Sequence, residues 1–202
     1  MHFPHFRRWA YGLFLASSIP LLASSSSTVS PKTSGTAAYQ AWDSEADASA
    51  LLKEIKSISA TLKTATGTLE SFSRQPQLSW QTHAYQLNQV REQINTFGEH
   101  LDGLQAMQSG MAPWQQSALD QMMPLAAIIA AHAESAIQHV NEHRPYLFAP
   151  VYADHLASLS NRSGDLKQTL DTFLEWGDTL DQLDRLEQKL DRVREKIGLL
   201  AS

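Results

Sequence analysis

Histidine is the residue type whose spacing in this chain could support chemistry. Six histidines lie beyond the first 23 residues, namely His83, His100, His132, His139, His143 and His155. His139 and His143 are four residues apart, so in a helix both rings reach the same side. Neutral imidazole binds zinc, copper and nickel, and helical bundles build metal sites from side chains on facing helices.

Hairpin geometry predicts where these histidines meet. If two helices fold back about Met111, position 139 comes level with position 83. A second fold near residues 145 and 146 brings position 155 level with about position 136. This geometry sets the height of each histidine along the bundle but not the direction in which its ring points. The candidate metal ligands at this bundle end are therefore His83, His139, His143 and His155.

An ordinary structural interpretation fits the same histidines. His83 and His143 continue apolar series and would cap the core, whereas His139 and His155 would face water. No HExxH motif is present, and Glu142 is the one carboxylate at a useful spacing. A metal site and a purely structural role both remain open from the sequence.

Other chemistry is poorly supported by the sequence. The chain has no cysteine, which excludes disulfides, thiolate sites and c-type haem attachment. Several methionines lie near the opposite end, where only His100 could join them to hold a b-type haem. Asp154 and His155 are adjacent, so in a helix their side chains point about 100° apart and make a poor catalytic pair. The prediction is a non-enzymatic protein without a cofactor.

The first 40 residues predict export. Arg7 and Arg8 precede an apolar run from residue 10 to residue 22, and small residues follow at 23–25. This pattern is typical of a secretory signal peptide over residues 1–23, with an uncleaved anchor as the alternative. A Ser-rich flexible linker is expected at 24–40 and a helical domain at 41–202. The protein is expected to be periplasmic or secreted, without stable membrane insertion after cleavage.

Composition limits the partners. The formal net charge is −5, and without Arg7 and Arg8 it becomes 14 − 21 = −7. A negative surface argues against nucleic acid as a partner. Hydrophobic residues make up 43% of the chain, enough for a modest core.

Apolar periodicity of three and four residues predicts four helices and no strand. The expected fold is all-α, an antiparallel up-down-up-down four-helix bundle with a long C-terminal helix. In the first helix the expected buried residues are Leu51, Ile55, Ile58, Leu62, Ala65, Leu69 and Phe72. In the second they are Leu87, Val90, Ile94, Phe97, Leu101 and Leu104, and in the third Leu119, Met122, Ala126, Ile129, Ala133, Ala136 and Val140.

A helical segment is expected to open at Pro150 and to lead, through a break or bend at residues 161–164, into the long last helix from Asp165 to Leu200. Its apolar residues form one predicted seam, which starts with Leu166, Leu170, Phe173, Gly177 and Leu180 and continues through Leu183 and Leu186 to Leu200. The end of this helix is expected to project, with a candidate interaction surface at Leu190, Val193, Ile197 and Leu200. The predicted function is binding to another protein or to itself, and the alternative is histidine-based metal binding or buffering.

Overall fold

The computed structural model describes residues 36–144 and 146–200, with side chains from 44 to 197. Its elements are α1 (Thr36–Phe72), α2 (Trp80–Ala106), the 3-10 turn η1 (Gln108–Gly110), α3 (Pro113–Glu142) and α4 (Pro150–Leu200). The described residues include no β-strand. The predicted all-helical fold with four packed helices is confirmed, and α1 already begins within the predicted linker.

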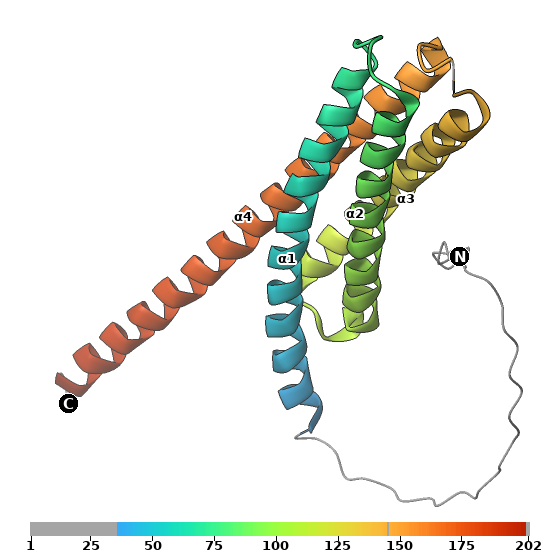
Figure 1. The fold of residues 1–202 in the computed structure, drawn as a ribbon. Coiled ribbons are helices and arrows are strands. Elements are labelled where there is room, and N and C mark those ends of the chain that lie inside the picture. The colour runs from blue at the N-terminus through green and yellow to red at the C-terminus, as the bar shows by residue number, and fades with distance from the viewer. Residues whose placement is uncertain (1–35, 145, 201–202) are drawn as a thin grey trace, which may run out of the picture.

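The four helices pack around one core. α1 packs against α2 and α4, and α3 packs against the same two helices. The α1–α2 and α3–α4 connections lie at one end of the bundle, and the α2–α3 connection lies at the other (Figure 1). α4 is the longest helix, and its C-terminal part projects well past the other three, as predicted (Figure 1). None of the described helices combines the length and apolarity needed to cross a membrane.

The buried faces of α2 and α3 are those that the periodicity predicts. Every predicted core residue of these two helices is buried, from Leu87 to Leu104 in α2 and from Leu119 to Val140 in α3. The start of α2 is capped by Ser79, whose hydroxyl accepts a hydrogen bond from the Thr82 backbone N–H at 3.3 Å.

The buried face of α1 is rotated from the predicted one. Its fully buried residues are Ala48, Leu52, Ile55, Ser59, Leu62, Thr66 and Leu69. The predicted Leu51 and Ile58 are only half-buried, on the edge of the core. Ser59 and Thr66 enter the core because their hydroxyls donate to carbonyls of the preceding turn, Ser59 to Lys56 at 2.8 Å and Thr66 to Leu62 at 2.9 Å.

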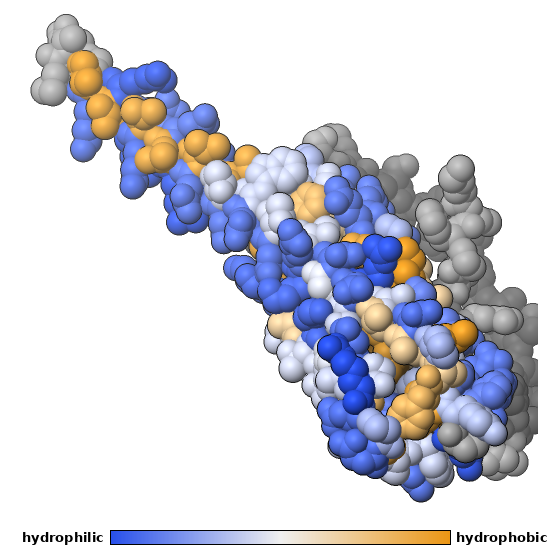
Figure 2. Space-filling model, turned by 90° about the horizontal axis from the view of Figure 1, so that it is seen from above, coloured by the Kyte–Doolittle hydropathy of each residue, from blue (hydrophilic) through white to orange (hydrophobic). Residues whose placement is uncertain are grey.

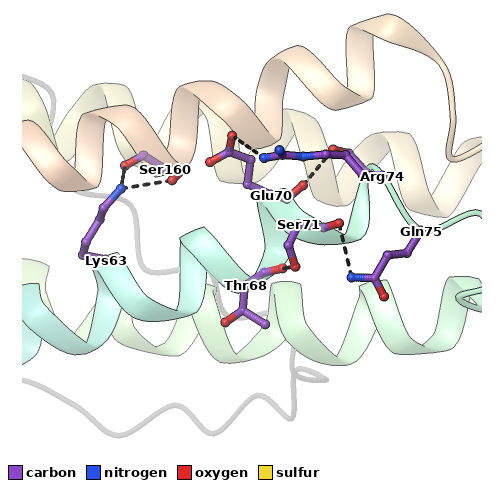
Figure 3. Close-up of polar contacts among 8 residues, drawn as sticks. Lys63, Thr68, Glu70, Ser71, Arg74, Gln75 and Ser160 are labelled. Atoms are coloured by element: carbon purple, nitrogen blue, oxygen red, sulfur yellow. Dashed lines mark hydrogen bonds and ion pairs between the residues drawn. The ribbon is translucent and has the colours of Figure 1, made fainter.

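α4 begins at Pro150, where the sequence pattern opens a helix, and it continues as one helix through residues 161–164, where a break or bend was expected. This part of α4 packs on α1, where the Lys63 ammonium donates to the Ser160 carbonyl at 2.9 Å and to its hydroxyl at 3.1 Å (Figure 3). Gly164 faces the same lysine, and a Cβ there would lie 3.5 Å from Nζ. Polar residues that resemble a loop in the sequence therefore form a helix–helix contact. Figure 3 also shows Arg74 paired with Glu70 at 3.4 Å near the end of α1.

Gln115 joins the start of α3 to α1. Its side-chain carbonyl accepts from the Ala112 backbone N–H at 2.9 Å. Its amide group donates to the Glu45 carbonyl at 3.0 Å and to the Ser49 hydroxyl at 2.8 Å. Gln115 is fully buried, and these bonds satisfy its polar atoms.

Trp114, next to Gln115, packs against α4 at Gly177. A Cβ built on Gly177 would lie 2.6 Å from the nearest ring carbon of Trp114. This close approach needs a glycine, because any larger residue must displace the ring.

Gly177→Ala is therefore expected to be less stable than a matched variant in which helix propensity alone changes. Gly67→Ala is that control, because a Cβ at Gly67 meets no atom within 4 Å and alanine favours a helix by about 1 kcal/mol. We expect the free energies of unfolding of the two variants to differ by about 1–3 kcal/mol, the usual penalty for overpacking. Urea unfolding measures the difference, and equal stabilisation of both would show that Trp114 moves aside freely.

Candidate functional site

The histidine end of the bundle is built around Tyr152, in the first turn of α4. Tyr152 is fully buried, and its hydroxyl lies 2.9 Å from Nδ1 of His83 on α2. The His83 ring is also buried, with Phe72 of α1 edge-on at a centroid distance of 5.4 Å. Burial lowers the pKa of His83 and raises the pKa of the Tyr152 phenol, so both are neutral near pH 7. Nε2 of His83 has no hydrogen-bond partner among the described residues.

His139 contacts Tyr152 from α3. Their rings stack at a centroid distance of 5.0 Å, and the ring of His143 stacks on His139 at 4.8 Å. Nε2 of His139 lies 3.2 Å from the Tyr146 carbonyl. His143 ends α3 and is exposed, so the interpretation that it caps the core is wrong. His83, in contrast, is buried with the core residues of α2.

His155 lies one turn further along α4 and meets His132 of α3. Their Nδ1 atoms are 3.3 Å apart, and both rings are half-buried. Burial lowers the pKa of His155, and the nearby imidazoles of His132 and His139 lower it further. The structural interpretation expected His139 and His155 to face water. Instead, each ring is half-buried and contacts another side chain.

The four predicted ligands thus lie at one end of the bundle but do not surround one point. Within the part of the chain that the structure describes, no three His, Cys, Asp or Glu side chains are placed to hold a metal ion. Metal binding by His83, His139, His143 and His155 stays a prediction. The hairpin geometry did not identify His132 and Tyr152, the residues that these rings contact. It gives the height of a residue along the bundle but not the direction in which its side chain points.

A second candidate site is the projecting part of α4. Every described residue from 181 to 197 is exposed. Five of them are large and apolar, each between 51% and 61% exposed, and we call them the tail stripe: Leu183, Leu186, Leu190, Val193 and Ile197. Figure 2 shows the stripe as a hydrophobic band along the projecting helix, with hydrophilic side chains beside it. Leu190, Val193 and Ile197 were predicted here, and the side chain of Leu200 lies outside the described residues.

The tail stripe does not continue the buried seam of α4. Each of the residues Gly177, Leu180, Leu183 and Leu186 lies three positions after the one before it. Nine residues make about two and a half turns, so Leu186 lies on the opposite face from Gly177. Gly177 is buried against the bundle, Leu180 is half-buried, and Leu183 is exposed. The prediction of one continuous seam is wrong, and the stripe faces away from its own bundle.

This rotation could have been found in the sequence. A seam needs steps of three and four in alternation, and three steps of three shift the face by about half a turn. Trp176 lies seven residues, or about two helical turns, before Leu183 and therefore on the same face of α4. It is 49% exposed. Leu183, Leu186 and Trp176 therefore belong to the exposed surface, although the sequence pattern placed the two leucines in the core.

Charged residues flank the tail stripe in two rows of opposite sign. At about 100° per residue, one side of the stripe carries the basic row, made of Arg185, Lys189, Arg192 and Lys196. The other side carries the acidic row, made of Asp184, Glu187 and Asp191. Arg194 interrupts the acidic row, where it pairs with Asp191 at 3.3 Å.

No known protein family, curated protein or solved structure matches this chain, so its function is inferred from its own residues.

Proposed function

We propose that this chain is an exported, non-enzymatic up-down-up-down helical bundle that acts through protein–protein interaction. The bundle holds the projecting part of α4 away from its own core, and the tail stripe packs against another helix. The observation that carries this proposal is the stripe itself, five exposed apolar residues that face away from the bundle.

The spacing and the exposure of the stripe support this role. Single exposed apolar residues are ordinary, whereas a contiguous exposed apolar surface marks an interaction site. The steps from Leu183 to Ile197 are three, four, three and four, which is the spacing of a helix that packs on a second helix. Charged rows on both sides keep such a helix soluble and orient the helix that it binds.

Export and partner class belong to the same proposal. The signal-peptide pattern and residues 24–35 of the predicted linker lie outside the described residues, and the sequence pattern there supports a periplasmic or secreted location. The net charge of −5 disfavours nucleic acid as the partner. What remains is another protein helix with an apolar stripe.

Site-specific photo-crosslinking in the cells that produce the protein tests this function. A photoreactive residue at Leu186 lies in the stripe, and one at Gln188 lies on the opposite side of the same helix. We expect covalent adducts with protein from position 186 and few from position 188. Leu190→Asp should remove the adducts from position 186, because a charge in the stripe opposes its burial. Similar yields from both positions would show that the stripe is not an interaction surface.

A further inference from the structure

We infer that the helix packed on the tail stripe belongs to a different protein and carries acidic residues along the edge that meets Lys189 and Lys196. This partner rests on the proposed function, since it occupies the same surface. It is identified by the charges next to the stripe, because such charges set the partner and the orientation of paired helices.

Only the inner members of the two charged rows lie where they can face a helix packed on the stripe. Lys189 and Lys196 lie about 60° round the helix from the nearest line of stripe residues. Glu187 and Arg194 lie about 40° from the stripe on its other side. The outer members lie about 100° away, and they are Asp184, Arg185, Asp191 and Arg192. A partner helix therefore meets three basic side chains and one acidic side chain.

Lys189 and Lys196 have no acid within reach on their own helix. Side chains three and four residues apart are neighbours on a helix surface. At these spacings the charged neighbours of Lys189 are Arg185 and Arg192, and Lys196 has Arg192 alone. Across the part of the chain that the structure describes, neither lysine forms an ion pair. The basic row is thus a line of like charges, and acidic residues of a partner would relieve its repulsion.

A second copy of this chain does not supply these acids. In a parallel pair Lys189 would lie beside Arg194 of the other copy. In an antiparallel pair with overlapping stripes Lys189 would lie beside Lys196. Glu187 would then meet Arg194 on the opposite edge, so attraction on one edge is offset by repulsion on the other. Both orientations set the lysine edge against positive charge.

An anionic membrane surface matches the tail less well than an acidic helix does. Helices that lie in a membrane surface have polar faces rich in Lys and Arg, whereas one side of the tail stripe carries the acidic row. A flat anionic surface would lie against both rows at once. A partner helix can place its acids along one edge only, where they meet Lys189 and Lys196.

Two synthetic helical peptides, added to the full chain, test the charge of the partner. Both carry the same heptad stripe of leucine and isoleucine, and every residue next to that stripe is Glu in the acidic peptide and Lys in the basic peptide. Like charges keep each peptide from pairing with itself. In either orientation the acidic peptide meets three basic side chains and one acid, and the basic peptide meets the same four with opposite effect.

Fluorescence anisotropy of the labelled peptides measures their affinities. We expect the acidic peptide to bind about 10-fold more tightly than the basic one at low salt, through several exposed ion pairs that are individually weak. The difference should shrink at about 1 M salt, where exposed charges are screened. Leu190→Asp should weaken the binding of both peptides, because a charge in the stripe opposes its burial. Equal affinity of wild type for the two peptides would overturn the acidic partner.

A charge reversal at the lysine edge should reverse the preference. Lys189→Glu combined with Lys196→Glu leaves three acids and one base next to the stripe, so this variant should favour the basic peptide. Arg185→Glu combined with Arg192→Glu changes the net charge equally, but at outer positions, and should keep the preference for the acidic peptide. The same reversal in both double variants would show that net charge alone acts, and it would also overturn the acidic partner.

Two further measurements on the full chain distinguish the other occupants. In analytical ultracentrifugation we expect wild type to be monomeric, and a dimer that Leu190→Asp dissociates would assign the stripe to a second copy. With phosphatidylglycerol vesicles we expect no flotation that depends on the stripe. Flotation of wild type that Leu190→Asp abolishes would assign the stripe to a membrane. Either result would overturn the acidic partner.

The outcomes also separate the acidic partner from the proposed function. If position 186 forms protein adducts in cells while wild type does not prefer the acidic peptide, the acidic partner is rejected and the interaction function is kept. If position 186 forms no specific adduct and neither peptide binds, both are rejected.

Discussion

Leu170→Ala is expected to lower the free energy of unfolding by about 2–5 kcal/mol, the usual range for a leucine removed from a core. Leu170 is completely buried in the bundle-facing part of α4. Leu190→Ala removes the same atoms from the same helix, but Leu190 is 57% exposed on the tail stripe. In dissociated protein its effect should stay within about 0.5 kcal/mol.

Urea unfolding at low protein concentration, followed by circular dichroism, measures both variants under conditions in which the tail is unpaired. Leu180→Ala should fall between them, because Leu180 is half-buried where α4 leaves the bundle. The sequence pattern predicted that Leu180 is buried like Leu170. Equal losses from Leu170→Ala and Leu190→Ala would mean that the tail packs on its own bundle in solution.

The second large effect is a loss of stability as the pH falls below about 6.5, the ordinary pKa of histidine. Burial lowers the pKa of His83 below its ordinary value of 6.5. The unfolded chain therefore takes up this proton at a higher pH than the folded chain does. Stability from neutral His83 is complete above pH 6.5 and is lost as the pH falls toward the lower folded pKa, by at most about 1.4 kcal/mol per pH unit for one proton. His155, whose pKa is also lowered, acts in the same direction.

Variants of the His83–Tyr152 pair separate the pH effect from packing. Tyr152→Phe leaves the buried imidazole without its 2.9 Å partner and is expected to cost about 1–3 kcal/mol at pH 7. His83→Phe combined with Tyr152→Phe replaces both polar groups by apolar rings and should be closer to wild type at pH 7. The double variant should also show a shallower decline below pH 6.5.

Thermal or urea unfolding at a series of pH values checks this behaviour. His100→Gln is a suitable control, because His100 lies elsewhere on α2 and pairs with Glu54 at the surface. An unchanged pH slope in the double variant would show that His83 is not the group responsible.

The parts of the fold that the sequence predicts well are those in which apolar residues alone mark the buried face. α2 and α3 are such helices, and their predicted core positions are all buried. In α1 the buried line includes Ser59 and Thr66, which a hydrophobic pattern assigns to the surface. Their hydroxyls bond within the helix, so tertiary packing overrides the pattern.

For the candidate sites, the sequence predicts how far along the bundle a residue lies but not the direction in which its side chain points. Helix lengths and connections place the histidines at one bundle end, as predicted. Which ring meets which depends on helix rotation, so the roles of Tyr152 and His132 could be learned only from the structure. For the tail stripe the rotation is present in the sequence, because Gly177, Leu180, Leu183 and Leu186 are each three residues apart, and a seam drawn through every leucine passes over this change of face.

The continuity of α4 has a consequence for how its tail binds. Starting a helix in water is unfavourable, whereas adding residues to an existing helix is not. The 51 residues of α4, roughly 75 Å at 1.5 Å per residue, include a first half that is already ordered by burial against the bundle. The exposed half therefore grows from a nucleus that folding has supplied, and the stripe is held as a helix before any encounter. Association then loses little conformational entropy, and the distance between the bundle and the bound helix is set by a rigid rod rather than by a flexible tether.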